Sequence, residues 1–157
     1  MKRHPGLVPL SREHHDGLLL ATRLQQGPRA LERLWSHDPG FQAQYVVRFF
    51  DDHLERHFQT EEEHIFPAGA LLPGLKEVVD ELLMEHDQLR TFVKTLREPP
   101  PGGRTELESL LVRLGEILEH HIRTEERIFF PGCEKLMTPA ELGRVGAAVA
   151  ARHKAPA

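Results

Sequence analysis

H-F-Q-T-E-E-E-H-I-F-P, residues 57–67, has a second copy further along the chain, H-I-R-T-E-E-R-I-F-F-P at residues 121–131. In each copy a His is followed four residues later by a Glu, then by a second Glu, and finally by an aromatic residue and a Pro. Four residues are about one helical turn, so the His and the first Glu of each copy lie on one helix face. Two such helices facing each other would surround a metal site with imidazoles and carboxylates.

Two more His residues, His14 and His86, stand in matching contexts on other predicted helices. Each follows a Glu, has a Leu four residues before it, and has apolar residues seven and ten positions after it. Charged residues are rarely buried unless they are paired or bind a metal, and both copies of the motif lie on apolar helix stripes. The pattern predicts one cage of metal ligands, made of His14, His57, Glu61, His86, His121 and Glu125.

Hydrophobic residues recur at helical spacing in four long segments, and no stretch alternates with the period of two that marks a strand. The predicted fold class is all-α: an antiparallel up-down four-helix bundle with a short extra C-terminal helix. We expect long helices at 11–26, 41–66, 73–97 and 105–131, a short helical piece at 29–36, and a fifth helix at 138–153. The expected organisation is an irregular lead at 1–9, the metal-binding bundle at 10–135 and an accessory helix at 138–154.

Capping residues set the expected helix starts. Ser11 is a candidate N-cap, and Pro73 suits a first helical position. Thr105 with a Glu three residues later, and Thr138 with Glu141, are capping-box signals. Pro67 and Pro131 are the expected ends of the two motif-bearing helices.

Composition narrows the class of protein. The chain has 157 residues and a net charge of −4, which gives no general reason to expect nucleic acid or an anionic membrane as a partner. No apolar run approaches the length of a membrane span, and no secretory signal is expected at the N-terminus. The single Cys, Cys133, cannot form an internal disulfide, which fits a cytoplasmic location.

The ligand types indicate which metals fit. Six ligands are too many for one tetrahedral zinc, but they suit two metals that share bridging carboxylates and keep one position open. The absence of Cys from the set argues against copper(I), structural zinc and iron–sulfur clusters. Nitrogen and carboxylate ligands suit iron, so we expect two iron ions, with manganese or zinc as the alternatives.

The ordered motifs resemble those of the hemerythrin-like (HHE cation-binding) domain. The matching parts are E-H at 13–14, H-F-Q-T-E-E at 57–62, E-H at 85–86 and H-I-R-T-E-E at 121–126. The resemblance covers roughly Leu10 to Pro131. It implies a non-haem di-iron centre in which Glu61 and Glu125 bridge the irons and the four His residues are terminal ligands. Members of this family bind O2 or react with related small oxidants.

The sequence departs from the oxygen-carrying members of that family. Those members have five His ligands and an Asp five residues after the last motif His, whereas Glu125 follows His121 by four. This spacing is closer to the sensing and repair branch. The Cys-bearing N-terminal segment of many iron–sulfur repair members is missing, which weakens a repair assignment.

Other His residues leave alternatives open. His15 competes with His14 as a ligand, and His64 is a candidate extra ligand, an outer-sphere group or a bundle-end residue. His53 and His120 are expected around the ligands or at the surface. The residues given no role are His4, His37 and His153.

The expected function is a di-iron protein that binds or senses O2, nitric oxide or peroxide in a stress response, rather than a dedicated enzyme. The alternatives are an iron–sulfur-cluster repair factor, a small di-iron oxidase or peroxidase, and a bundle with a redox-inert structural metal. The expected partner is a small gaseous or peroxide ligand, without nucleic acid or membrane. A homodimer through the fifth helix stays an open alternative.

Overall fold

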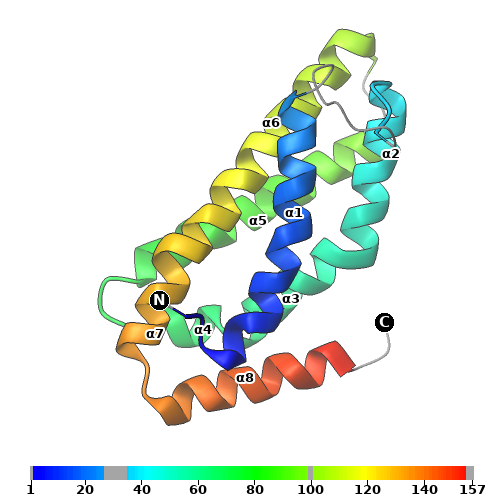
Figure 1. The fold of residues 1–157 in the computed structure, drawn as a ribbon. Helices are drawn as coiled ribbons and strands as arrows, with labels where there is room; N and C mark the ends of the chain where they lie inside the picture. Colours follow the sequence, from blue (N-terminus) through cyan, green and yellow to red (C-terminus); the bar gives the residue numbers. More distant parts are fainter. Residues whose placement is uncertain (1, 27–34, 99–100, 155–157) are drawn as a thin grey trace.

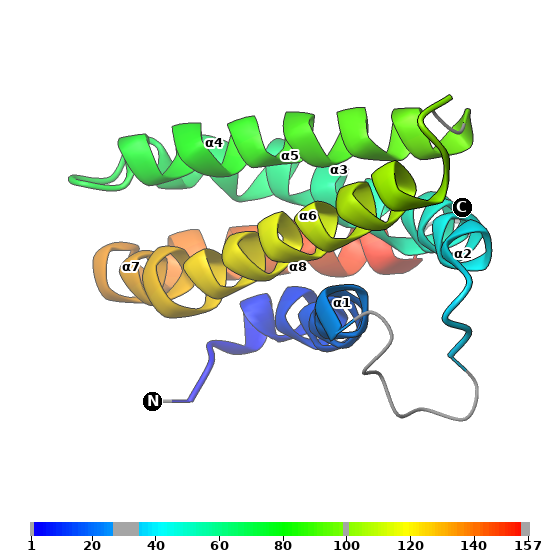
Figure 2. The same ribbon diagram turned by 90° about the horizontal axis from the view of Figure 1, so that it is seen from above.

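The computed structural model describes residues 2–26, 35–98 and 101–154, and Figure 1 shows them as a bundle of helices without a β-strand. Its long members lie side by side in both views (Figures 1 and 2). They are α1 (Val8–Gln26), α2 (Pro39–Phe49), α3 (Glu55–His64), α5 (Lys76–Arg97) and α6 (Gly103–Thr124). The shorter helices near one end are η1 (Pro5–Leu7), α4 (Phe66–Gly69), α7 (Phe130–Leu136) and α8 (Pro139–Lys154). The expected helical piece at 29–36 falls mostly outside the described residues.

Two π-helical turns interrupt the helices that carry the motif. One is η3 (Phe50–Leu54), which joins α2 to α3, and the other is η4 (Glu125–Phe129), which follows α6. Each is closed by an N–H that donates to the carbonyl oxygen five residues earlier. Because such turns are rare and gather at functional sites, their place beside both motifs points to this part of the bundle.

The π-turn η4 corrects one expectation about the inner helix face. At 3.6 residues per turn, Ile128, seven residues after His121, belongs on that face, but it is 53% exposed. A π-turn adds one residue per turn, so the next residue, Phe129, takes the inward place and is fully buried. A sequence pattern read at 3.6 residues per turn cannot anticipate this shift.

The N-terminal lead is helical from Pro5, so the expectations of an irregular lead to Pro9 and of an N-cap at Ser11 were wrong. Pro5 and Pro9 each lie in the first turn of a helix, where the backbone N–H has no acceptor within the helix. A proline at such a position therefore loses no hydrogen bond. His4 caps this start, because its Nδ1 accepts the Gly6 N–H at 3.1 Å. The prolines that looked like irregular structure therefore open helices.

Two other expected starts also moved. α5 begins at Lys76 rather than at Pro73, because Gly74 has a φ of 79° and cannot continue a right-handed helix. α6 begins at Gly103, two residues before Thr105. The capping box at α8 is confirmed: Thr138 N–H donates to Glu141 at 2.7 Å and the Thr138 hydroxyl accepts the Glu141 N–H at 3.2 Å.

Neither motif proline ends the helical path. Pro67 lies in the first turn of α4, and Pro131 lies in the first turn of α7. The chain can continue because a proline at the start of a new helical segment sacrifices no hydrogen bond. No described helix combines the length and apolarity needed to cross a bilayer.

Two hydrophobic clusters form the core, one toward each end of the bundle. The first includes Leu24, Val46, Val93 and Leu118, from the long helices. The second is made by the short helices around Leu7 and by the inner faces of neighbouring long helices. In Figure 1, α8 runs across this second end, beneath α1 and α3.

Candidate metal centre

Six buried His and Glu side chains meet in the interior of the bundle. α1 and α5 each supply one His, α3 supplies a His and a Glu, and the α6–η4 helix supplies the others. None of the six is more than 4% exposed. They are the six residues that the motifs indicated: His14, His57, Glu61, His86, His121 and Glu125.

The six side chains form two overlapping sets of four. Within each set, one nitrogen or oxygen atom from every member lies within 4.8 Å of the others. Both sets contain the two Glu residues, and each set adds two His residues. The first set is His14, His57, Glu61 and Glu125, and the second set is His86, His121, Glu61 and Glu125.

Glu61 presents one oxygen to each set. Its Oε1 lies 2.8 Å from Nε2 of His57 and 3.5 Å from Nε2 of His14. Its Oε2 lies 3.2 Å from Nε2 of His86. Its two oxygens therefore serve different pairs of imidazoles, which is the arrangement of a carboxylate that bridges two cations.

Glu125 is arranged in the same way from the opposite motif. Its Oε1 lies 2.6 Å from Nε2 of His121, in the second set, and its Oε2 lies 3.6 Å from Nε2 of His14, in the first. Glu125 is also the first residue of the π-turn η4. The change from α-helix to π-turn thus begins at one of the two carboxylates that both sets contain.

The spacing of the imidazole nitrogens fits cation binding. Nε2 of His14 lies 3.0 Å from Nε2 of His57, and Nε2 of His86 lies 3.1 Å from Nε2 of His121. Two nitrogens bound at about 2.1 Å to one ion, at right angles to each other, would be about 3.0 Å apart. Each His pair therefore has the separation expected of two ligands of one ion.

The carboxylates of Glu61 and Glu125 also fit a cation. All four of their oxygens are buried, and none has a partner in hydrogen-bond geometry. A buried carboxylate without such partners is costly, and nearby positive charge is the compensation that proteins use. The chemistry of the donor set, imidazole nitrogen plus carboxylate oxygen, suits a first-row transition metal.

The pKa shifts of the metal-free site also show that its buried negative charge requires compensation by positive charge. Burial and the negative charge of Glu61 raise the pKa of the Glu125 carboxyl. Burial opposes protonation of His121, but the neighbouring carboxylates, chiefly Glu125, outweigh it and raise the pKa of His121 to about 10. Protons thus neutralise the site when no metal does, and a divalent cation would replace them.

An outer layer of carboxylates orients the imidazoles, and sequence reasoning missed its role. Nδ1 of His14 lies 2.7 Å from Glu126, and Nδ1 of His86 lies 2.8 Å from Glu62. Burial opposes ionisation of both carboxyls, but the hydrogen bonds from His14 and His86 outweigh it and hold each pKa at about 2. An Nδ1–H that donates to a carboxylate leaves the Nε2 lone pair facing the site.

The other two imidazoles also face outer carboxylates: His121 is within hydrogen-bond distance, whereas Nδ1 of His57 makes no hydrogen bond and lies at ion-pair distance. Nδ1 of His57 lies 3.5 Å from Glu13, and Nδ1 of His121 lies 3.1 Å from Glu85. The sequence did carry a signal for all four carboxylates, because each stands next to a candidate ligand in an E-H or E-E pair. The signal is hard to interpret because each Glu contacts a His on another helix.

The structure brings His14 to the site and not His15, which is exposed. His64 belongs to neither ligand set; its side chain is 29% exposed and lies 3.6 Å from Glu63. His64 is the last residue of α3, so its position matches the third alternative, a residue at the end of the bundle. His120 is exposed and bonds to an outer carboxylate, Glu85, at 2.6 Å.

Aromatic rings line the candidate site. The Phe58 ring stacks on His86 with centroids 3.9 Å apart, and the Phe130 ring stacks on His14 at 5.5 Å. Both Phe rings are at most 1% exposed. They restrict the imidazole orientations and keep water from this side of the site.

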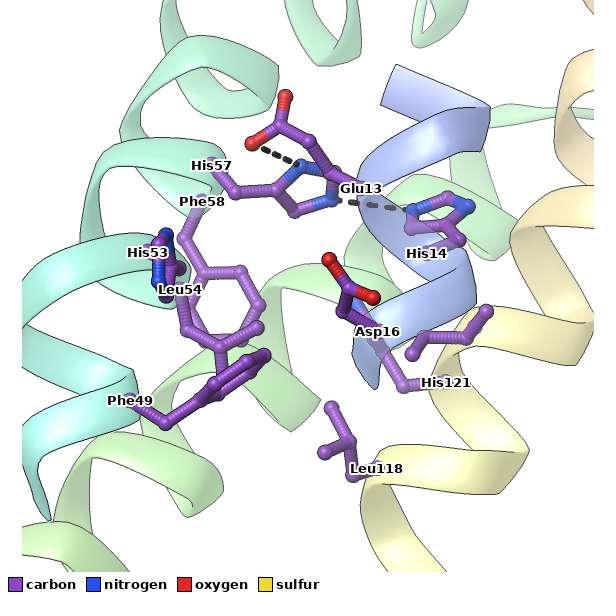
Figure 3. A pocket seen from close by; sticks show the side chains of 11 residues that line it. Glu13, His14, Asp16, Phe49, His53, Leu54, His57, Phe58, Leu118 and His121 are labelled. Atoms are coloured by element: carbon purple, nitrogen blue, oxygen red, sulfur yellow. Dashed lines mark hydrogen bonds and ion pairs between the residues drawn. The ribbon is translucent and has the colours of Figure 1, made fainter. Parts of the chain in front are cut away.

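A small cavity of about 40 Å³ reaches three of the six candidate ligands. Figure 3 shows His14, His57 and His121 on its wall, with the Glu13–His57 and His57–His14 contacts dashed. A water molecule needs about 10–15 Å³ of such volume, and drug-sized ligands occupy about 300–1,000 Å³. The other lining residues are Glu13, Asp16, Phe49, His53, Leu54, Phe58, Leu118 and Ile122.

Cys133 lies apart from the ligand sets. It is fully buried in the second hydrophobic cluster. Burial raises the pKa of its thiol to about 12, so the thiolate that would bind metal or react is disfavoured there.

Comparison with known proteins agrees with the site. The family model for the hemerythrin HHE cation binding domain matches residues 9–133, a range that contains all six candidate ligands and their outer carboxylates. No match was found among curated proteins or among solved structures. The buried His and Glu clusters fit the cation binding for which the family model is named. With most of its length matched by that model, the chain belongs to the hemerythrin HHE cation-binding family.

Proposed function

We propose that this protein is a non-haem di-iron protein that binds or senses O2, nitric oxide or peroxide. The observation that carries the proposal is the pair of ligand sets that share Glu61 and Glu125, each of which turns one oxygen to each set. One ion per set, with both carboxylates as bridges, uses every candidate ligand. Manganese and zinc suit the same donors and remain the alternative metals.

The proposal includes the antiparallel up-down arrangement of a four-helix bundle. In Figure 1 the chain passes along the molecule through α1, through α2 and α3, and then through α5 and α6 in turn. This order supports an arrangement in which the two motif helices, α3 and α6, lie opposite each other, with the single-His helices α1 and α5 between them.

The residues around the site prepare it for a small ligand. Hydrogen bonds to outer carboxylates fix the tautomers of His14, His86 and His121, and stacked Phe rings cover one face of His86 and of His14. When bound, two ferrous ions supply the electrons and the open coordination position on which binding of a small oxidant depends. The cavity of about 40 Å³ is the place where that ligand would enter, and its size favours a molecule of few atoms over an organic substrate.

The discriminating experiment mixes anaerobically reduced, iron-loaded protein with O2, nitric oxide or hydrogen peroxide while the visible spectrum is recorded. The proposal predicts a saturating change of one ligand per iron pair, reversible for at least one gas. Repeated consumption of peroxide with a reductant would instead favour the peroxidase alternative. Metal-dependent stability without any visible redox change would favour the structural-metal alternative and overturn the proposal.

A further inference from the structure

The outer carboxylates are held in turn by basic side chains, and these differ between the two sets. In the second set, Arg90 of α5 bonds Glu62 at 2.8 Å and 3.0 Å. His120 of α6 bonds Glu85 at 2.6 Å. Both basic residues therefore come from the same long helices that carry the second set.

In the first set, the basic groups come from the two ends of the chain. Arg3, which precedes η1, bonds the Glu126 carboxylate at 2.7 Å. His153, in the last turn of α8, bonds Glu13 through Nε2. The outer support of His14 and His57 is thus supplied from outside the four long helices.

The two chain ends pack tightly on each other. A Cβ added to Gly146 in α8 would lie only 2.6 Å from Cα of Gly6 in η1, so the backbones touch where they cross. Leu7, Leu142 and Val149 are buried in one cluster around this crossing. We call residues 3–7 and α8 together the clasp.

The C-terminal end of the clasp is fixed to α3. Arg152 donates to Gln59 at 2.6 Å and to Glu63 at 3.2 Å. Nδ1 of His153 lies 2.9 Å from the Val149 carbonyl oxygen while its Nε2 faces Glu13. Both ring nitrogens of His153 therefore face oxygen atoms, one on its own helix and one on α1.

We propose that the clasp positions one half of the metal centre. Arg3 and His153 are positioning residues that hold the outer carboxylates of His14 and His57, so docking of the chain ends sets the metal affinity of the first set. The outer carboxylates of the second set are held directly by Arg90 and His120 of the bundle rather than by the clasp. This inference rests on the proposed function, because it assigns a control element to the same metal centre.

The physical basis is the orientation of the imidazole rings. Glu13 is about one-third exposed, so without His153 its carboxylate can turn into solvent and release Nδ1 of His57. Loss of an outer partner of a metal-binding His typically costs about 10-fold to 100-fold in metal affinity. The rings of His86 and His121 keep their own partners, so the loss is confined to one ion.

The test compares His153→Ala with His120→Ala in the full chain. Each variant removes a His that bonds an outer carboxylate: His153 bonds Glu13 of the first set, and His120 bonds Glu85 of the second set. His153→Gln keeps a donor for Glu13 and serves as the conservative rescue. Gly146→Leu separates α8 from η1, and Gly143→Ala, where an added Cβ meets nothing within 4 Å, controls for substitution in α8.

The first readout is the release of iron to an excess of chelator. In His153→Ala and Gly146→Leu, one of the two ions is expected to leave about 10-fold faster or more while the other keeps its wild-type rate. His153→Gln and Gly143→Ala are expected to stay near wild type. Wild-type release in His153→Ala, or equal acceleration of both ions, would overturn the proposal.

The second readout needs no metal. Nitrogen NMR of the His rings in metal-free protein reports the surroundings of each Nδ1, including the charge or hydrogen-bond partner that it faces. His153→Ala is expected to change the His57 signal, and His120→Ala the His121 signal. Unchanged His57 signals, or equal changes in all four rings, would contradict the clasp. If wild-type protein fails to hold two ions, the proposed function fails, and this NMR comparison still decides whether the clasp positions the ring.

Discussion

At the scale of single residues, the decisive feature is a pair of buried carboxylates, Glu61 and Glu125, with no hydrogen-bond partner for any of their four oxygens. Two like charges in one apolar interior are unfavourable unless protons or cations compensate them. The imidazole nitrogens that surround these oxygens lie at distances suited to shared cations. Bound cations would therefore account for the burial that packing alone leaves unexplained.

Replacing either bridging candidate by Ala is expected to lower the metal content from two ions per chain to one or fewer, because each carboxylate offers an oxygen to both sets. Glu116→Ala is the matched control, since Glu116 lies on α6, the helix that leads into Glu125, and is exposed. Metal analysis of the purified variants provides the measurement. Retention of two ions in both Glu61→Ala and Glu125→Ala would rule out bridging.

The cavity gives a second prediction at this scale. Leu118→Phe is expected to slow or abolish binding of the gaseous ligand without loss of metal, because Leu118 lines the cavity and contributes no ligand atom. Leu114→Phe is the matched control, since Leu114 is buried four residues earlier on α6 and does not line the cavity. Stopped-flow binding rates distinguish the two, and equal rates would show that the ligand enters elsewhere.

Four of the six clustered residues could be found from the sequence because the two H-x3-E pairs are local, and His14 and His86 because their E-H contexts match. A His and a Glu four residues apart share a helix face wherever the helix packs. The roles of Glu13 and Glu126 could not be found in this way, because each contacts a His on a different helix. Contacts between helices depend on rotation and offset, which periodicity in one segment does not specify.

At the scale of elements, the long helices follow from apolar periodicity, whereas the π-turns η3 and η4 do not. A π-turn leaves the apolar residues in place but shifts the register after it, as the exchange of Ile128 for Phe129 illustrates. The helix starts moved for a related reason: several residues that look like breakers, such as Pro5 and Gly103, stand in first turns. The presence of Pro or Gly alone therefore did not indicate where each helix begins.

The contact between α4 and η4 depends on a small residue. An added Cβ at Gly69 would lie 2.5 Å from the Phe129 ring, so Gly69→Ala is expected to destabilise the fold by about 1–3 kcal/mol through overpacking. Gly143→Ala, in an open position of α8, is expected to stabilise by about 0.5–1 kcal/mol through helix propensity. Urea unfolding gives both values, and a stabilised Gly69→Ala would contradict this packing.

At the scale of the whole molecule, the bundle contains two apolar clusters and a buried centre of His and Glu side chains. The apolar clusters hold the helices together, whereas the buried ionisable groups of the centre destabilise the fold when no cation is bound. The clasp adds a connection from the chain ends to one side of that centre. Metal content and stability should therefore vary together.

Stability is expected to depend on pH in opposite ways with and without metal. The pKa of His121 in the metal-free protein is about 10, above the ordinary 6.5. Its contribution is therefore complete below pH 6.5 and is lost as the pH rises toward 10, so the metal-free protein weakens over this range. Metal binding displaces the protons and tightens as the pH rises. Urea midpoints of both forms at pH 7 and pH 9 test this, and parallel changes would contradict it.

The most direct test of the central claim is anomalous diffraction from crystals of the iron-loaded protein, recorded on both sides of the iron absorption edge. The account predicts two iron peaks per chain: one bound by His14 and His57, the other by His86 and His121, with Glu61 and Glu125 contacting both. A single peak, or peaks away from these side chains, would contradict the di-iron centre.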